Sequence, residues 1–173
     1  MATSSSIKKL NPRLQSVFGH LTPSEDIEIR KILDSTDELL LEFAYFWRKD
    51  HAGCEGPGLD LNWFPSGQIV ISSSVSAGSD GDHMVSFLVS LYPTWIYGDF
   101  PLEGWQVEAE IEADCQHKIY CGYMHCVYKL PSVISANPIE AVTALHNITA
   151  ELIQLGKEKP IEYWLQLAGE KSS

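Results

Sequence analysis

The sequence predicts an α+β fold in which one antiparallel sheet packs against helices in two layers. Two segments carry apolar residues at helical spacing behind clear N-terminal caps, and the region between them alternates apolar and polar residues. Helical and strand segments are also grouped rather than interleaved along the chain, which is typical of the α+β class. We expect a single domain over residues 1–173, of ordinary globular composition, with residues 1–9 disordered.

The first long helix is predicted from a capping box. Thr22 can accept a hydrogen bond from the backbone three residues on, and Glu25 can reach back to the backbone of Thr22. Pro23 suits the first helical position because its missing N–H would have no partner there. The apolar residues that follow recur on one helical face, which predicts a helix over residues 23–49.

Strand patterns fill the middle of the chain and predict a meander of about five strands. In the first four segments apolar residues recur at alternate positions, and Gly, Pro, Ser and Asp gather between the segments. The expected strands are 59–63, 69–75, 84–92, 106–114 and 119–130. The expected loops and irregular segments are 51–58, 65–67, 77–82 and 93–104, with a linker between Pro131 and Pro138.

Two C-terminal helices complete the predicted order of elements. Asn137 is a good N-cap and Pro138 suits the first helical position. An apolar stripe continues to Leu155, and Gly156 is a plausible stop for this helix. Pro160 opens a last short helix. We therefore expect an N-terminal helix and C-terminal helices to pack against the sheet.

Charge is distributed unevenly along the chain. The net charge is −11, from 12 basic and 23 acidic residues. No lysine or arginine lies between Asp50 and His117, a stretch that holds eleven of the acids, so the rest of the chain is balanced. Duplex nucleic acid and anionic membranes need a clustered basic surface, so direct nucleic-acid and membrane partners are not expected.

An acidic ladder is the most distinctive feature of this stretch. In the fourth predicted strand Glu108, Glu110, Glu112 and Asp114 share one face, about 6.6–6.8 Å apart. A solvated sheet face usually mixes charges of both signs, because opposite charges on neighbouring strands stabilise each other. The first four predicted strands bring no lysine or arginine to the ladder. A positively charged ligand would offset the repulsion, although the ladder also has the simpler interpretation of promoting solubility.

An aromatic segment lies directly before the ladder. Five of the eighteen aromatic residues fall in residues 92–105, together with two prolines and two glycines. Aromatic side chains offer large, rigid contact areas and dominate binding interfaces. The segment is interpreted equally as a binding loop or as a lid over the core, anchored by Trp95 and Trp105.

Cysteine and histidine residues gather between residues 115 and 126. Their spacing does not match a zinc finger, and at most Cys115, His117 and Cys121 would meet at the end of a hairpin. The alternative is that these side chains are simply packed strand residues. The nucleophile-elbow and phosphate-loop motifs are absent from the sequence. No secretion signal or long apolar segment is seen, so we expect a cytoplasmic protein with reduced thiols.

These observations favour a non-enzymatic module that binds a basic protein, of the immunity, inhibitor or adaptor type. The partner would be a toxin or another nucleic-acid-binding enzyme, and no cofactor or metal is expected. The predicted partner-binding residues are Glu108, Glu110, Glu112, Asp114, Trp95 and Trp105. The alternative is a small-molecule or zinc-binding protein, or an enzyme, with a pocket between sheet and helices that uses His and Cys residues of 115–126. The exposed edge of the sheet could also pair with a second copy to give a homodimer.

Overall fold

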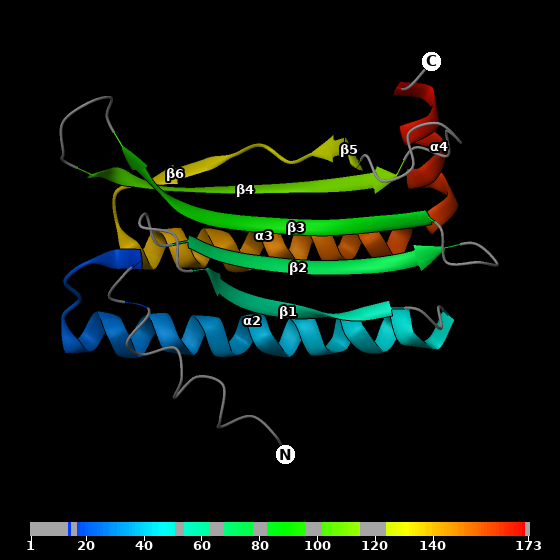
Figure 1. The fold of residues 1–173 in the computed structure, drawn as a ribbon. Coiled ribbons are helices and arrows are strands. Elements are labelled where there is room, and N and C mark those ends of the chain that lie inside the picture. Colours follow the sequence, from blue (N-terminus) through cyan, green and yellow to red (C-terminus); the bar gives the residue numbers. More distant parts are fainter. Residues whose placement is uncertain are drawn as a thin grey trace.

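An antiparallel sheet and two long helices lie in two layers, with a shorter helix at one end (Figure 1). The computed structural model describes residue 14 and residues 17–50, 54–62, 68–77, 83–95, 102–114 and 124–171; for 44–50, 54–62, 76–77, 95, 102–103 and 171 it describes the backbone alone. The described elements are α2 (Pro23–Asp50), β1 (Cys54–Asn62), β2 (Gln68–Ala77), β3 (His83–Trp95), β4 (Leu102–Asp114), β5 (Met124–Lys129), β6 (Val133–Ser135), α3 (Pro138–Glu158) and α4 (Ile161–Lys171). The predicted segment 1–9 lies outside the described residues.

The sheet is a meander, as predicted. Strands β1 to β5 are neighbours in chain order, and each pair is antiparallel. The short strand β6 pairs with the beginning of β4, whereas β5 pairs with its end. The α+β class, the N-terminal helix and the C-terminal helices are thereby confirmed.

Both predicted helix caps are present. The backbone N–H of Thr22 donates to Glu25 Oε2 at 2.8 Å, and the N–H of Glu25 donates to Thr22 Oγ1 at 3.4 Å. At the start of α3, Asn137 Oδ1 accepts from the backbone N–H of Ile139 at 2.9 Å and of Glu140 at 3.3 Å. Each cap satisfies N–H groups that have no partner within the helix.

The prediction that Gly156 stops α3 is wrong. The helix continues to Glu158, and the backbone N–H of Lys159 closes it by donating to Leu155 O at 3.2 Å. A Cβ at position 156 would lie only 3.1 Å from the ring of Phe87 and 3.2 Å from that of Phe43. Gly156 therefore allows close packing of the helix on two aromatic rings, within the helix rather than after it.

Strands occupy parts of the segments that the sequence predicts to be loops or irregular. Strand β1 already begins in the segment 51–58, with an irregular register between Glu55 and Gly58. An edge strand tolerates such glycines and prolines because one side of its backbone needs no partner. Strands β3 and β4 both extend into the segment 93–104, which was expected to be irregular. Strand β6 was missed because three residues are too short to show an alternating pattern.

One glycine explains how β6 approaches β4. Gly104 has a φ of 154°, and a Cβ there would collide with the carbonyl oxygen of Ser135. The close approach of the two backbones therefore requires glycine at this position.

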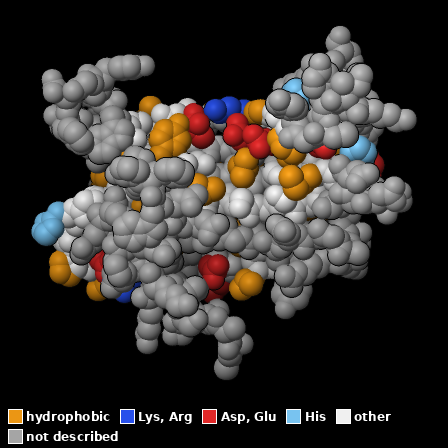
Figure 2. Space-filling model, in the orientation of Figure 1, with side chains coloured by type: hydrophobic (Ala, Val, Ile, Leu, Met, Phe, Trp, Pro, Cys, Tyr) orange, Lys and Arg blue, Asp and Glu red, His pale blue; other side chains and the backbone are white. Residues whose placement is uncertain are grey.

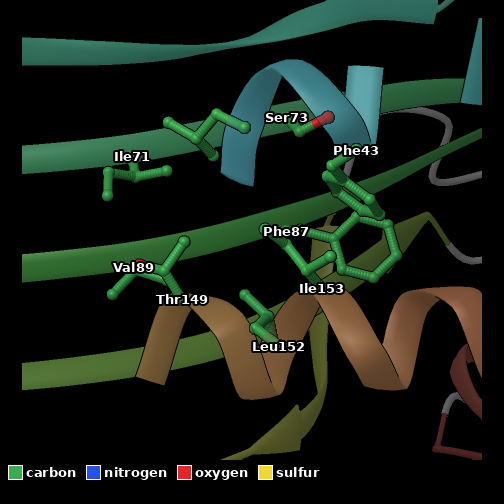
Figure 3. Close-up of a pocket in the computed structure, with 9 residues that line it drawn as sticks. Phe43, Ile71, Ser73, Phe87, Val89, Thr149, Leu152 and Ile153 are labelled. Atoms are coloured by element: carbon green, nitrogen blue, oxygen red, sulfur yellow. The ribbon is translucent and has the colours of Figure 1, made fainter. Parts of the chain in front are cut away.

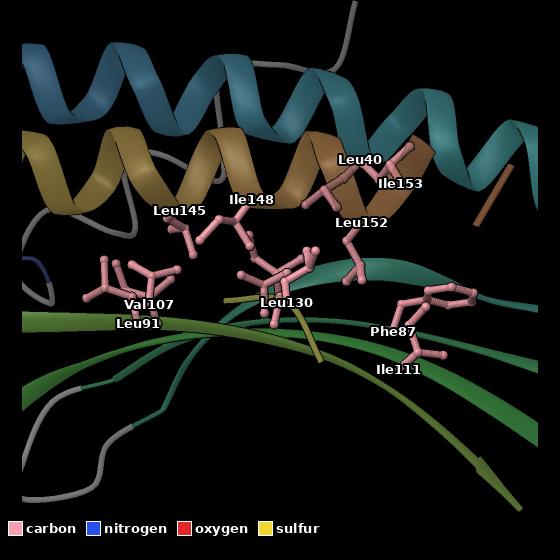
Figure 4. Close-up of a cluster of buried hydrophobic side chains, with 14 of the residues drawn as sticks. Leu40, Phe87, Leu91, Val107, Ile111, Leu130, Leu145, Ile148, Leu152 and Ile153 are labelled. Atoms are coloured by element: carbon pink, nitrogen blue, oxygen red, sulfur yellow. The ribbon is translucent and has the colours of Figure 1, made fainter. Parts of the chain in front are cut away.

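The hydrophobic core lies between the helices and one face of the sheet, as Figure 4 shows for α3. We call this side the helix face. Its buried residues alternate along the strands, and α3 supplies the facing apolar stripe. Helices α2 and α3 also contact each other, and Thr36 Oγ1 and His146 Nδ1 are hydrogen-bonded at 3.0 Å between them. The strand residues are Ile69, Ile71, Val75, Val85, Phe87, Val89, Leu91, Val107, Ala109, Ile111 and Ala113.

Candidate binding face

The other side of the sheet carries no described helix, and strands β2 and β3 pass in front of α3 in this view (Figure 1). We call it the open face. Its side chains come from the alternate positions of the same strands and are mostly half-buried. The members that form the candidate site are Ser72, Ser74, Ser86, Leu88, Ser90, Tyr92, Glu108, Glu110 and Glu112.

Strand register places each glutamate beside a residue of β3. Glu112 lies opposite Ser86, Glu110 opposite Leu88 and Glu108 opposite Ser90. The β3 column is therefore two hydroxyls around one leucine, and it offers no positive charge to the carboxylates. Ser86 Oγ is bonded to the hydroxyl of Ser74 on β2 at 2.9 Å, which extends the polar surface away from the ladder.

The first carboxylate of the ladder already has partners. Lys129 Nζ lies 3.3 Å from Glu108 Oε1, and the amide of Gln106 donates to the same oxygen at 2.8 Å. Glu110 and Glu112 have no ion pair within the described part of the chain. Acidic side chains gather in the upper part of the face shown in Figure 2, next to a basic side chain. The available negative charge is therefore concentrated on two neighbouring glutamates.

The electrostatics of the site reflect this crowding. Partial burial, and secondly the charge of Glu110, raise the pKa of Glu112 above its ordinary value. Burial is also the main reason that the pKa of Tyr92 rises to about 12, followed by its hydrogen bond to Glu108 and the charges of Glu108 and Glu110. Both shifts report a surface on which further negative charge is unfavourable.

Asp114, the last member of the ladder, differs from the glutamates in burial. It keeps the open-face register, opposite Met124 on β5, but only 7% of the residue is exposed. Its Oδ1 atom finds no hydrogen-bond partner among the described residues. A buried carboxylate oxygen without a donor is unfavourable, and the ladder ends at such an oxygen.

The structure places Trp105 in the core, not on a binding loop. It lies on the helix face of β4 with 5% exposure, and its indole N–H donates to the carbonyl of Val17 at 2.9 Å. Its ring also packs against Phe18, with centroids 5.4 Å apart. The predicted role of Trp105 in partner binding is therefore corrected to a structural one. The position could have been read from sequence, since Trp105 continues the buried alternation of Val107 and Ala109.

The side chain of the other predicted anchor, Trp95, lies outside the described residues, although its backbone belongs to β3. The structure instead brings Ser86, Ser90 and Tyr92 next to the ladder, which sequence reasoning did not select. The alternation within 84–92 did place these residues together on one face. The register that sets them beside particular glutamates had no signal in a single sequence.

The alternative metal site gains no support from the described residues. Cys115, His117 and Cys121 lie outside them, and no group of three His, Cys, Asp or Glu side chains in the described ranges is placed to hold a metal ion. Cys126 lies on β5, and its Sγ donates to the carbonyl oxygen of Tyr128 at 3.5 Å.

A small cavity lies between the sheet and helices α2 and α3 (Figure 3). Its volume is about 10 Å³, which is room for one water molecule but not for an organic ligand. Among the described residues that line it, Ser73 and Thr149 are polar and none is a histidine or a cysteine. The lining residues are Leu40, Phe43, Ile71, Ser73, Phe87, Val89, Thr149, Leu152 and Ile153.

None of the helices in the described part of the chain has both the length and the apolar composition needed to span a bilayer. Comparisons with protein-family models, with curated proteins and with solved structures found no match to this chain.

Proposed function

We propose that this protein is a non-enzymatic binding module whose open face captures a basic protein partner. The observation that carries the proposal is the row of half-buried carboxylates on β4, in which Glu110 and Glu112 have no cation partner among the described residues. Burial, and secondly the repulsion from Glu110, raise the pKa of Glu112, and an arriving lysine or arginine would offset the repulsion.

Electrostatic complementarity suits this role because it speeds encounter and selects the partner. Oppositely charged surfaces associate at up to about 10⁸–10⁹ M⁻¹s⁻¹ at low salt, against about 10⁵–10⁶ for neutral pairs. Nucleic-acid-binding enzymes, including toxin nucleases, carry the basic surfaces that such a face would fit. An immunity protein, an inhibitor or an adaptor would each use the open face in this way. The cytoplasm, a reducing compartment, is the proposed location of this module.

The test removes two negative charges from the open face in one variant and two from the helices in a control variant, so that the two variants have the same net charge. The wild type and the double variant Glu110→Gln/Glu112→Gln are used to capture proteins from a lysate over a salt series. The control is Glu28→Gln/Glu151→Gln, which removes the same charge from exposed positions on α2 and α3. A basic protein retained by the wild type and the control is then purified and titrated against all three proteins.

We expect the open-face variant to bind that partner about three- to tenfold more weakly than the control, with affinity falling as salt rises. Equal affinity of the two variants, or a retained partner that is not basic, would contradict the proposal.

A further inference from the structure

We infer that the open face recognises an extended segment of its partner, with lysine or arginine at every second residue, lying along β4. This inference rests on the proposed function and adds the conformation and spacing of the bound cations. It starts from the arrangement of Glu108, Glu110 and Glu112 in one column on a single strand.

The spacing of the column matches an extended chain. Alternate residues of a strand are about 6.6–6.8 Å apart, so the three glutamates span about 13 Å. An extended peptide has the same repeat and presents residues i, i+2 and i+4 on one side. A helix keeps three cations on one face at i, i+4 and i+7, and seven residues of helix rise only about 10.5 Å. A helix would therefore fall about 3 Å short of matching all three carboxylates, which is a little under half of one side-chain spacing.

The neighbouring column makes room for such a segment. The β3 residues beside the ladder are Ser86, Leu88 and Ser90, which are shorter than the glutamates. Ser90 is half-buried on the open face, directly opposite Glu108. Leu88 provides the single apolar contact at the centre of this column.

The two ends of the glutamate column differ in their existing partners, so the three glutamates should not bind cations equally. At one end Glu108 is already paired with Lys129 and Gln106. At the other end the column continues to Asp114, more than nine-tenths buried, whose Oδ1 has no hydrogen-bond partner among the described residues. The bound cations should therefore engage Glu110 and Glu112 most strongly, and Glu108 least.

The experiment uses three synthetic peptides of equal charge, titrated into the full-length protein at low salt. In the first, three lysines alternate with threonine; in the second, the same residues are rearranged so that the lysines are consecutive. The third is a helix-forming peptide with lysines at i, i+4 and i+7. We expect the alternating peptide to bind about three- to tenfold more tightly than the other two. We also expect Glu110→Gln to weaken it more than Glu108→Gln does, while Glu151→Gln leaves it unchanged.

The outcomes separate this inference from the proposed function. If all three peptides bind equally and Glu110→Gln weakens each of them, the face binds cations without a preferred conformation, and the inference is overturned while the proposed function stands. Tighter binding of the helical peptide overturns the inference in the same way. If no peptide binds at low salt, or if Glu110→Gln and Glu151→Gln have equal effects, both ideas fail.

Discussion

The two faces of the sheet are made by the same strands but are constrained by different requirements. On the helix face, β3 presents Val85, Phe87, Val89 and Leu91 to a close-packed core. On the open face, the intervening residues are serines, one leucine and a tyrosine, next to the glutamates of β4. Folding requires apolar residues on the first face and leaves the second largely free. The composition of the open face is therefore less constrained by folding than that of the helix face, and the following changes test this division.

The largest expected effect is the difference in stability loss between alanine substitutions at two adjacent residues of β3, one on each face. Phe87 is 3% exposed and packs edge-to-face against Phe43, so Phe87→Ala should lower the free energy of unfolding by about 3–5 kcal/mol. Leu88 is half-buried on the open face, and Leu88→Ala should lower it by about 1 kcal/mol. Denaturant unfolding of both variants measures the difference. Similar losses would show that the open face is also covered.

Trp105 tests the corrected assignment of a residue to the helix face. Trp105→Phe keeps a ring in the core but leaves the carbonyl of Val17 without its indole donor. We expect the free energy of unfolding to fall by about 1–2 kcal/mol. Titration with the alternating lysine peptide should give the same affinity as for the wild type. Weaker peptide binding with unchanged stability would instead assign Trp105 to the binding surface.

Ser73 is the polar exception among the β2 residues on the helix face. It is 4% exposed, and its Oγ has no hydrogen-bond partner among the described residues. Removing an unsatisfied buried hydroxyl should raise the free energy of unfolding, by about 1 kcal/mol for Ser73→Ala. The matched change Ser72→Ala, on the open face, should stay within about 0.5 kcal/mol of the wild type. A loss of stability in Ser73→Ala would mean that water in the adjoining cavity satisfies the hydroxyl.

The smallest effect concerns the charge of Glu112 and depends on pH. Because its pKa is higher in the folded protein, the folded state holds this proton more tightly than the unfolded state. Stability is therefore lost as the pH rises from the ordinary glutamate pKa of about 4.3 through the raised value. At neutral pH, Glu112→Gln should raise the free energy of unfolding by about 0.5 kcal/mol after allowance for solvent screening. Below about pH 4 the gain should vanish, since both side chains are then neutral. Urea unfolding of the variant and the wild type at the two pH values measures this difference. An equal gain in the free energy of unfolding at both pH values would contradict this account.

The sequence predicted what depends on local physics. Capping residues locate the helices, and period-two alternation divides β3 and β4 into their two faces. Gly156 was misread because its place in the helix is decided by Phe43 and Phe87, which lie far away in the sequence. Trp105 was misread because the prolines and glycines before it suggested a loop. The pairing of Glu108 with Lys129, which divides the ladder into satisfied and available carboxylates, depends on the register between strands and left no sequence signal.

The contact between α2 and α3 has a consequence for the way the chain is made. The hydrogen bond between Thr36 and His146 joins residues 110 positions apart, on helices that come before and after the sheet in sequence. A nascent chain that has emerged only as far as β5 has no α3 with which to cover α2 or the apolar side of its strands. Apolar surface that stays uncovered during synthesis is prone to aggregation. Completion of the core must therefore wait for synthesis of residues 138–158, and a transcript truncated before them would yield an aggregation-prone product.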